Sequence, residues 1–141
     1  MSAAKALQVI KLIEQLAELR GILKHRHKGE KQVTYYVMVA AALGLFSGSA
    51  VLANLLGEIQ DEDYKRGEPF LSSLVVSSQT GIPGSGFFAH ARKLGCKIGK
   101  DPVSEFLFWA SQMNALDVTF PGEAFETAKA LGITEPQVAA A

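Results

Sequence analysis

The residues with the clearest potential for chemistry form one glycine-rich loop and the start of the helix expected after it. Gly81, Gly84 and Gly86 can adopt positive φ angles, and Pro83 stiffens the turn between them. Backbone amides in such a loop, followed by a helix N-terminus, bind anions. The loop is therefore a candidate ligand-binding site, and a tight connection that binds nothing is the alternative.

Two cations in the following helix favour an anionic ligand. Arg92 and Lys93 lie within residues 87–94, where apolar residues recur at helical spacing before a stop at Gly95. The glycine order differs from that of the dinucleotide fingerprint, and the ending of a P-loop is absent. One option is a phosphorylated nucleotide-type small ligand, held by the following residues: Thr80, Gly81, Pro83, Gly84, Gly86, Arg92 and Lys93.

An apolar segment precedes the loop and is expected to position it. Residues 69–77 are uncharged, β-branched in the middle and apolar on both parities, which predicts a strand buried on both faces. Pro69 lacks an amide hydrogen and fits only the start of a strand or an edge. The unit therefore predicts a strand, a glycine loop and a short helix.

Residues 32–57 carry no charge, yet the sequence favours two helices over a membrane span. A Phe-Ser-Gly-Ser break divides the run into two pieces that are too short to cross a bilayer. Thr34 is expected to cap the first helix, which ends at Gly44. Ser49 is expected to cap the second, over about residues 50–63. This order is typical of a helix-turn-helix.

These elements predict a mostly α protein with a small β component, in a single domain over residues 1–141. Residues 1–31 are expected to form a long N-terminal helix, to about residue 24, and a basic patch. Residues 32–100 are expected to form a winged-helix-like helix-turn-helix core with the glycine loop. Residues 101–141 are expected to form C-terminal helices, the first of them started by an Asp-Pro pair.

The N-terminal helix carries an apolar seam that suits self-association. The seam repeats at alternating spacings of three and four, in the following residues: Val9, Leu12, Leu16, Leu19 and Leu23. Packing within the domain and a homo-oligomer seam both remain open. Residues 1–33 carry seven Lys/Arg against three Glu, a net +4, and the remainder has a net −4. Such a split suits a basic surface or head-to-tail association.

A basic patch lies at the end of this helix and suits the phosphates of a nucleic acid. It consists of Arg20, Lys24, Arg26, Lys28 and Lys31. A solvated helix end is the alternative. The second helix of the helix-turn-helix is a poor reader of DNA, because its acidic end repels phosphate. Its exposed residues are expected to include Asn54, Glu58, Gln60, Asp61, Glu62 and Asp63.

No nucleophile, base and orienting group can be assembled from the sequence, so an enzyme is the less favoured class. His90 is expected at the surface and Cys96 in the core. His25 and His27 lack further ligands nearby, and the acids of the second helix suit a solvated face better than a cation site. We therefore expect neither metal nor cofactor, a cytoplasmic location, and no membrane partner.

Residues 33–95 resemble a family of small, uncharacterised bacterial and phage-type proteins. The motif reads Gly67-x-Pro69-x-Leu71-Ser72-x-Leu74-Val75-Val76, then Thr80-Gly81-x-Pro83-Gly84-x-Gly86-Phe87-Phe88. The first half resembles the winged-helix part of alkyltransferase-like proteins, although Tyr36 replaces a glycine there. The resemblance implies a fold and no particular chemistry.

Three functional hypotheses result. The first is a non-catalytic binding module that contacts nucleic acid or a nucleoprotein through the basic patch. The second is a binder or sequesterer of a phosphorylated nucleotide-type ligand at the loop over residues 81–86. The third is an oligomeric assembly protein that uses the N-terminal helix as its seam.

Overall fold

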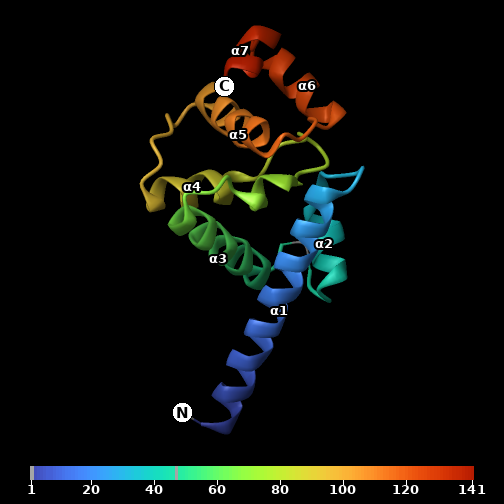
Figure 1. Cartoon of the computed structure of the whole chain (residues 1–141), viewed down its shortest axis with the longest axis vertical. Helices are drawn as coiled ribbons and strands as arrows, with labels where there is room; N and C mark the ends of the chain where they lie inside the picture. Colours follow the sequence, from blue (N-terminus) through green and yellow to red (C-terminus); the bar gives the residue numbers. More distant parts are fainter. Residues whose placement is uncertain (1, 47) are drawn as a thin grey trace.

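The computed structural model describes residues 2–46 and 48–141, and it confirms a mostly α protein with a small β component. Figure 1 shows the helices stacked along one long axis, with the two ends of the chain far apart. In chain order the elements are α1 (Ala3–Lys28), β1 (Thr34–Tyr35), α2 (Tyr36–Ala42), α3 (Ala50–Arg66), the 3-10 helix η1 (Leu71–Leu74), β2 (Val75–Val76), α4 (Ser85–Leu94), α5 (Pro102–Leu116), α6 (Gly122–Ala130) and α7 (Glu135–Ala140).

Helix α1 is longer than expected and only half of it belongs to the body of the protein. Ser2 caps it by accepting a hydrogen bond from the amide of Lys5, and it continues to Lys28. Its buried residues, Leu19 and Leu23, both lie in the second half. The first half extends away from the other helices (Figure 1).

The two helices predicted in the uncharged region are present as α2 and α3. Gly44 has a φ of 69°, as a helix-ending glycine should, and the Ser49 hydroxyl accepts from the amide of Val51. The predicted cap at Thr34 is wrong, because Thr34 lies in β1 and α2 starts two residues later. The predicted break at residues 46–49 includes Ser47, which lies outside the described residues.

No helix within the described parts of the chain combines the length and apolar character that a bilayer crossing requires.

The predicted strand over residues 69–77 is wrong in extent, although its burial is confirmed. Only Val75 and Val76 form β2, and the four residues before them form η1. The amide of Phe70 donates to Oε1 of Gln112, and that of Leu71 donates to Oδ2 of Asp63, each at 2.9 Å. Side-chain acceptors therefore take the place of a neighbouring strand.

Strands β1 and β2 pair in parallel, with Thr34 opposite Val75 and Tyr35 opposite Val76. Consecutive residues of a strand face opposite sides. Val75 accordingly packs in a cluster with α1, α2 and α3, whereas Val76 packs in a second cluster with α4, α5 and α6. The segment from η1 to β2 thus joins two cores. The winged-helix detail of the fold stays a prediction.

The C-terminal helices begin as their sequence predicts. Asp101 caps α5 through the amide of Ser104, with Pro102 in the first turn. The buried Trp109 of α5 donates from Nε1 to the carbonyl of Ser73 at 2.9 Å. This hydrogen bond fixes α5 to η1.

Gly81 provides a test of how the glycine loop is packed. Its φ is +73°, and a Cβ there would lie 2.4 Å from the amide nitrogen of Ala124. Gly132 has the same φ with nothing within 4 Å, so it isolates the cost of the backbone conformation. We expect Gly132→Ala to cost about 1 kcal/mol and Gly81→Ala about 3 kcal/mol or more in urea unfolding. Equal losses would contradict the close packing of the loop on α6.

Asp63 gives the fold a pH dependence of known sign. Asp63 is 2% exposed, and this burial raises the pKa of its carboxyl above the ordinary 3.8. The Leu71 amide and Arg66 lower the pKa, whereas Glu68 and Glu62 raise it further. The folded protein therefore holds this proton more tightly than the unfolded chain. The ionised carboxylate costs stability above the raised pKa, and the cost disappears as pH falls towards 3.8.

Asp63→Asn keeps an oxygen for the Leu71 amide and removes the charge. We expect the stability of this variant relative to the wild type to fall as the pH is lowered from 7 to about 4, in urea midpoints measured across that range. Asp63→Ala, the control, lacks the acceptor and should be destabilised at every pH. A relative stability that rises on acidification would show that the carboxylate is stabilised by the fold.

Candidate ligand-binding site

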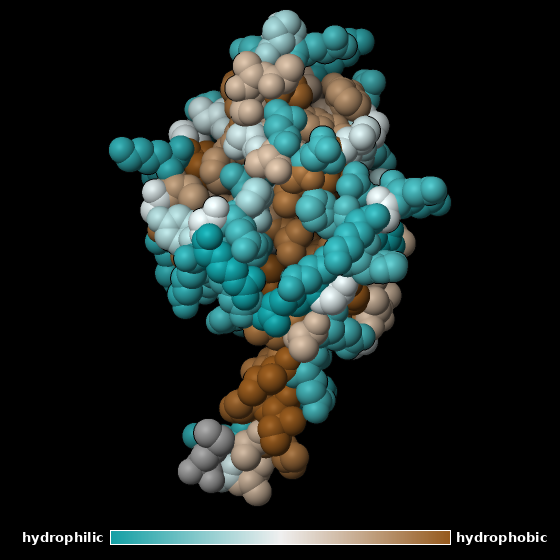
Figure 2. Space-filling view, in the orientation of Figure 1, coloured by the Kyte–Doolittle hydropathy of each residue, from teal (hydrophilic) through white to brown (hydrophobic). Residues whose placement is uncertain are grey.

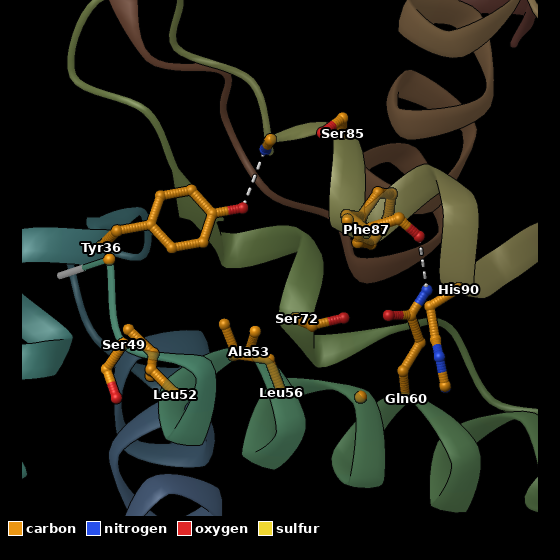
Figure 3. A pocket seen from close by; sticks show the side chains of 14 residues that line it. Tyr36, Ser49, Leu52, Ala53, Leu56, Gln60, Ser72, Ser85, Phe87 and His90 are labelled. Carbon is orange, nitrogen blue, oxygen red and sulfur yellow. Dashed lines mark hydrogen bonds between the residues drawn. The ribbon is translucent and has the colours of Figure 1, made fainter.

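A cavity of about 500 Å³ lies between α3, η1 and the first turn of α4. Figure 3 shows one face of α3 as its base, with the side chains of Leu52, Ala53 and Leu56 directed into it. These residues recur at helical spacing on the side of α3 that is turned towards α4. The base of the cavity is therefore apolar.

Tyr36 forms one wall at the start of α2. Its phenol oxygen accepts a hydrogen bond from the amide of Gly84 at 2.8 Å, which joins α2 to the glycine loop across the cavity (Figure 3). Burial raises the pKa of this phenol, and the Gly84 amide acts in the opposite direction. The phenol is therefore neutral at physiological pH, and its own proton is available to a ligand.

Two polar side chains meet at the deep end of the cavity. Gln60 is buried, and its Nε2 donates to the carbonyl of Phe87 at 3.0 Å, which leaves Oε1 as an acceptor. Ser72 is 4% exposed, and its hydroxyl has no hydrogen-bond partner among the described residues. Figure 3 shows the Ser72 hydroxyl and the Gln60 side-chain oxygen pointing towards one another. An unpaired buried hydroxyl costs free energy unless something in the cavity pairs with it.

The first turn of α4 supplies donors at the rim. Gly84 is the N-cap and has no side chain, so no side chain caps this helix. Ser85 and Gly86 follow it and line the cavity with Phe87. The first amides of a helix have no acceptor within the helix and carry a partial positive charge. They can donate to a polar group of a ligand.

The cavity is nearly free of formal charge. None of the described residues that line it is a Lys, Arg, Asp or Glu. His90 lines one side, and its Nε2 lies 2.6 Å from Oδ1 of Asp61, a residue outside the lining. The imidazole lies about 3.5 Å from where a Cβ would extend from Gly57, which is an ordinary van der Waals distance, so the ring packs beside α3 at this position. The lining suits an uncharged ligand with polar edges.

The structure brings two of the five predicted loop residues to the cavity. Gly84 and Gly86 line the cavity, whereas Gly81 and Pro83 are buried and do not line it. Thr80 is exposed, and its carbonyl accepts from the hydroxyl of Thr127 on α6 at 2.7 Å. The first part of the loop is thus held against α6, and only its second part is available to a ligand.

The two predicted anion-binding cations are directed elsewhere. Arg92 donates to the carbonyls of Ile98 and Gly99 and lies 2.8 Å from a carboxylate oxygen of Glu105. Lys93 lines a separate groove on the other side of His90. Neither residue lines the cavity, so a phosphate there would meet no Lys or Arg side chain among the described lining residues.

The basic patch is partly occupied by contacts within the protein. Arg20 lies 2.6 Å from Glu62, and Arg26 donates to the carbonyl of Lys31. Lys24, Lys28 and Lys31 are exposed. Three lysines of the predicted patch are therefore open to solvent at the end of α1 and in the segment after it.

The acidic end of α3 is not the solvated face that the sequence predicts. Gln60 and Asp63 are buried, because this end of α3 packs against η1 and α4. Asp61 is bound to His90, so His90 is also not the free surface histidine that was expected. Asn54 and Glu58 are exposed, as predicted. Within the described residues, no group of three or more His, Cys, Asp or Glu is placed to hold a metal ion.

Comparison with known proteins gives no relative: the chain matches no protein-family model, no curated protein and no solved structure. The resemblance of residues 33–95 to small bacterial and phage-type proteins therefore stays a prediction. The function has to be inferred from the geometry of the cavity and of the surfaces around it.

Sequence reasoning missed three residues of the site: Tyr36, Gln60 and Ser72. Tyr36 was noted only as a substitution within the family pattern, and Gln60 was expected at the surface. The polar contacts that place them join residues 27 and 48 positions apart. A serine pair inside an apolar run was the one local signal, because serine is rarely buried without a partner.

Removing the Tyr36 hydroxyl tests the link across the cavity. In Tyr36→Phe the Gly84 amide loses its acceptor, and we expect a loss of about 1 kcal/mol in stability with faster hydrogen exchange at Gly84. Tyr64→Phe on α3 is the control: Tyr64 is partly exposed and lies outside the cavity lining, so it should leave Gly84 exchange unchanged. Unchanged exchange in Tyr36→Phe would contradict the link.

Proposed function

We propose that this protein is a binding module that takes a single planar nitrogen heterocycle, a nucleobase, into the cavity between α3 and α4. The observation that carries the proposal is the buried, unpaired hydroxyl of Ser72 at the deep end of an open cavity. A group that pairs with it there recovers a hydrogen bond that the free protein lacks.

The shape and polarity of the lining support a nucleobase. The volume of about 500 Å³ lies within the range of small-molecule sites and accommodates a nucleoside. Tyr36 and Phe87 contribute aromatic rings, and the floor of the cavity on α3 is apolar. Nucleobases have flat apolar faces and edges that carry both donors and acceptors, and proteins hold unstacked bases by such combined contacts.

The hydrogen-bonding groups of the cavity also match the edge of a nucleobase, which carries both donors and acceptors. Oε1 of Gln60 is an acceptor, the Ser72 hydroxyl can donate or accept, and the amides at the start of α4 are donors. The absence of Lys and Arg from the described lining favours an uncharged ring over a phosphate as the group inside the cavity.

The base can be free or part of a nucleic acid strand, and exposed lysines make the second source reasonable. Lys31 lies five residues before Tyr36, so their Cα atoms are at most about 18 Å apart. Its side chain and those of Lys24 and Lys28 are exposed. These cations suit the phosphates of a strand whose base occupies the cavity.

The test is a titration of the full chain with the common nucleosides and with a short mixed-sequence single strand, followed by amide NMR shifts. We expect binding of at least one nucleoside, with the largest shifts at residues 84–87. Because the lining is uncharged, nucleoside affinity should be insensitive to salt and a 5′-phosphate should add little. Tighter binding of the strand with a steep salt dependence would identify nucleic acid as the source.

Ser72→Ala and Ser73→Ala form a matched pair of variants. Both hydroxyls are buried and unpaired, but only Ser72 lines the cavity. Both substitutions should leave the melting temperature unchanged or raise it, because each removes an unsatisfied polar group. Only Ser72→Ala should weaken nucleoside binding, by about tenfold. Equal affinities in the two variants, or no binding of any nucleoside or strand, would overturn the proposal.

A further inference from the structure

The first half of α1 is an apolar arm that the rest of the described chain covers only at its inner end, where Leu16 packs against the cluster around Leu19 and Leu23. We define the arm as residues 3–16. Its large apolar residues are solvent-exposed, with Ile13 61% exposed, Leu12 46% and Val9 43%. Figure 2 shows hydrophobic residues gathered on the part of the molecule that projects from the body. An exposed apolar surface of this kind marks an interaction site.

A groove runs along the base of the arm. It has a volume of about 710 Å³ and lies between the arm and α3, with α4 at one end. The arm contributes Val9, Leu12, Ile13 and Leu16 to it. The opposite wall is α3, with apolar residues and two acids, Glu58 and Asp61.

We infer that the occupant of this groove is the arm of a second copy of this chain. One element provides both the projecting apolar surface and one wall of the groove. Two arms that run antiparallel about a two-fold axis therefore place each arm in the groove of the other copy, and both grooves are filled at once. An isologous contact of this kind closes, so it forms a dimer and no filament.

The apolar stripe of α1 supports this arrangement. Leu19 and Leu23 are buried within the chain, and the same heptad stripe continues into the arm through Val9, Leu12 and Leu16. The inner part of the stripe thus packs against its own domain. Leu16 packs partly against the same cluster, and Val9 and Leu12 are left for a second copy.

The charges of the two surfaces are complementary. Lys5 lies four residues before Val9, on the same stripe near the tip of the arm. The groove presents Glu58 and Asp61, and Lys93 is the one cation among its described lining residues. Antiparallel seating carries the tip of one arm towards the acidic wall of the other copy.

Sedimentation and light scattering of the full chain at micromolar concentration test the inference. We expect a dimer, and a monomer in Leu12→Asp, because a carboxylate would enter the apolar groove. Leu7→Asp is the matched control: Leu7 is exposed on the same arm but does not line the groove, so this variant should remain a dimer.

Charge exchange tests the direction of seating. Glu58→Lys should weaken the dimer, and the double variant Lys5→Glu with Glu58→Lys should restore it. A wild-type monomer overturns the inference, and so does a monomer that binds anionic phospholipid vesicles through the arm. Dimers of both Leu7→Asp and Leu12→Asp would overturn it as well. None of these measurements uses a nucleoside, so they are independent of the proposed ligand.

Discussion

The fold depends on how the backbone around η1 is satisfied between two hydrophobic clusters. A buried turn has no neighbouring strand to pair its amides, and an unpaired buried amide is costly. Here the side chains of Gln112 and Asp63 accept from Phe70 and Leu71, and they come from α5 and α3 on either side of the turn. The turn is thereby fixed to both halves of the protein. The two valines of β2 can then face opposite clusters.

The same turn gives the cavity its polar end. It directs the hydroxyls of Ser72 and Ser73 inward, and neither has a partner among the described residues. Ser73 lies outside the cavity lining, so no ligand in the cavity removes the free-energy cost of its unpaired hydroxyl. Ser72 belongs to the cavity lining, so under the proposed function its cost is relieved when a ligand pairs with the hydroxyl. Polar groups that are unsatisfied in the free protein and satisfied in the complex add directly to affinity.

Local signals in the sequence were sufficient for most helix ends and insufficient for the site. Ser49, Gly95 and Asp101 act on amides or backbone angles within a few residues, so their roles could be predicted. The prediction of a strand over residues 69–77 was wrong because Asp63 and Gln112 hold a 3-10 turn there instead. These two residues are 8 and 42 positions away from the amides that they bind. The predicted exposure of Gln60 was wrong for the same reason. The sequence places Gln60 beside acidic residues, and only tertiary packing buries it.

Helix α3 is the wall that separates the cavity from the groove beneath the arm. Both surfaces include Ala53, Gly57 and His90 in their lining. The imidazole of His90 packs beside Gly57, and its Nε2 lies 2.6 Å from Oδ1 of Asp61, which lines the groove. Any shift of α3 or of the His90 ring would therefore change the shape of both surfaces.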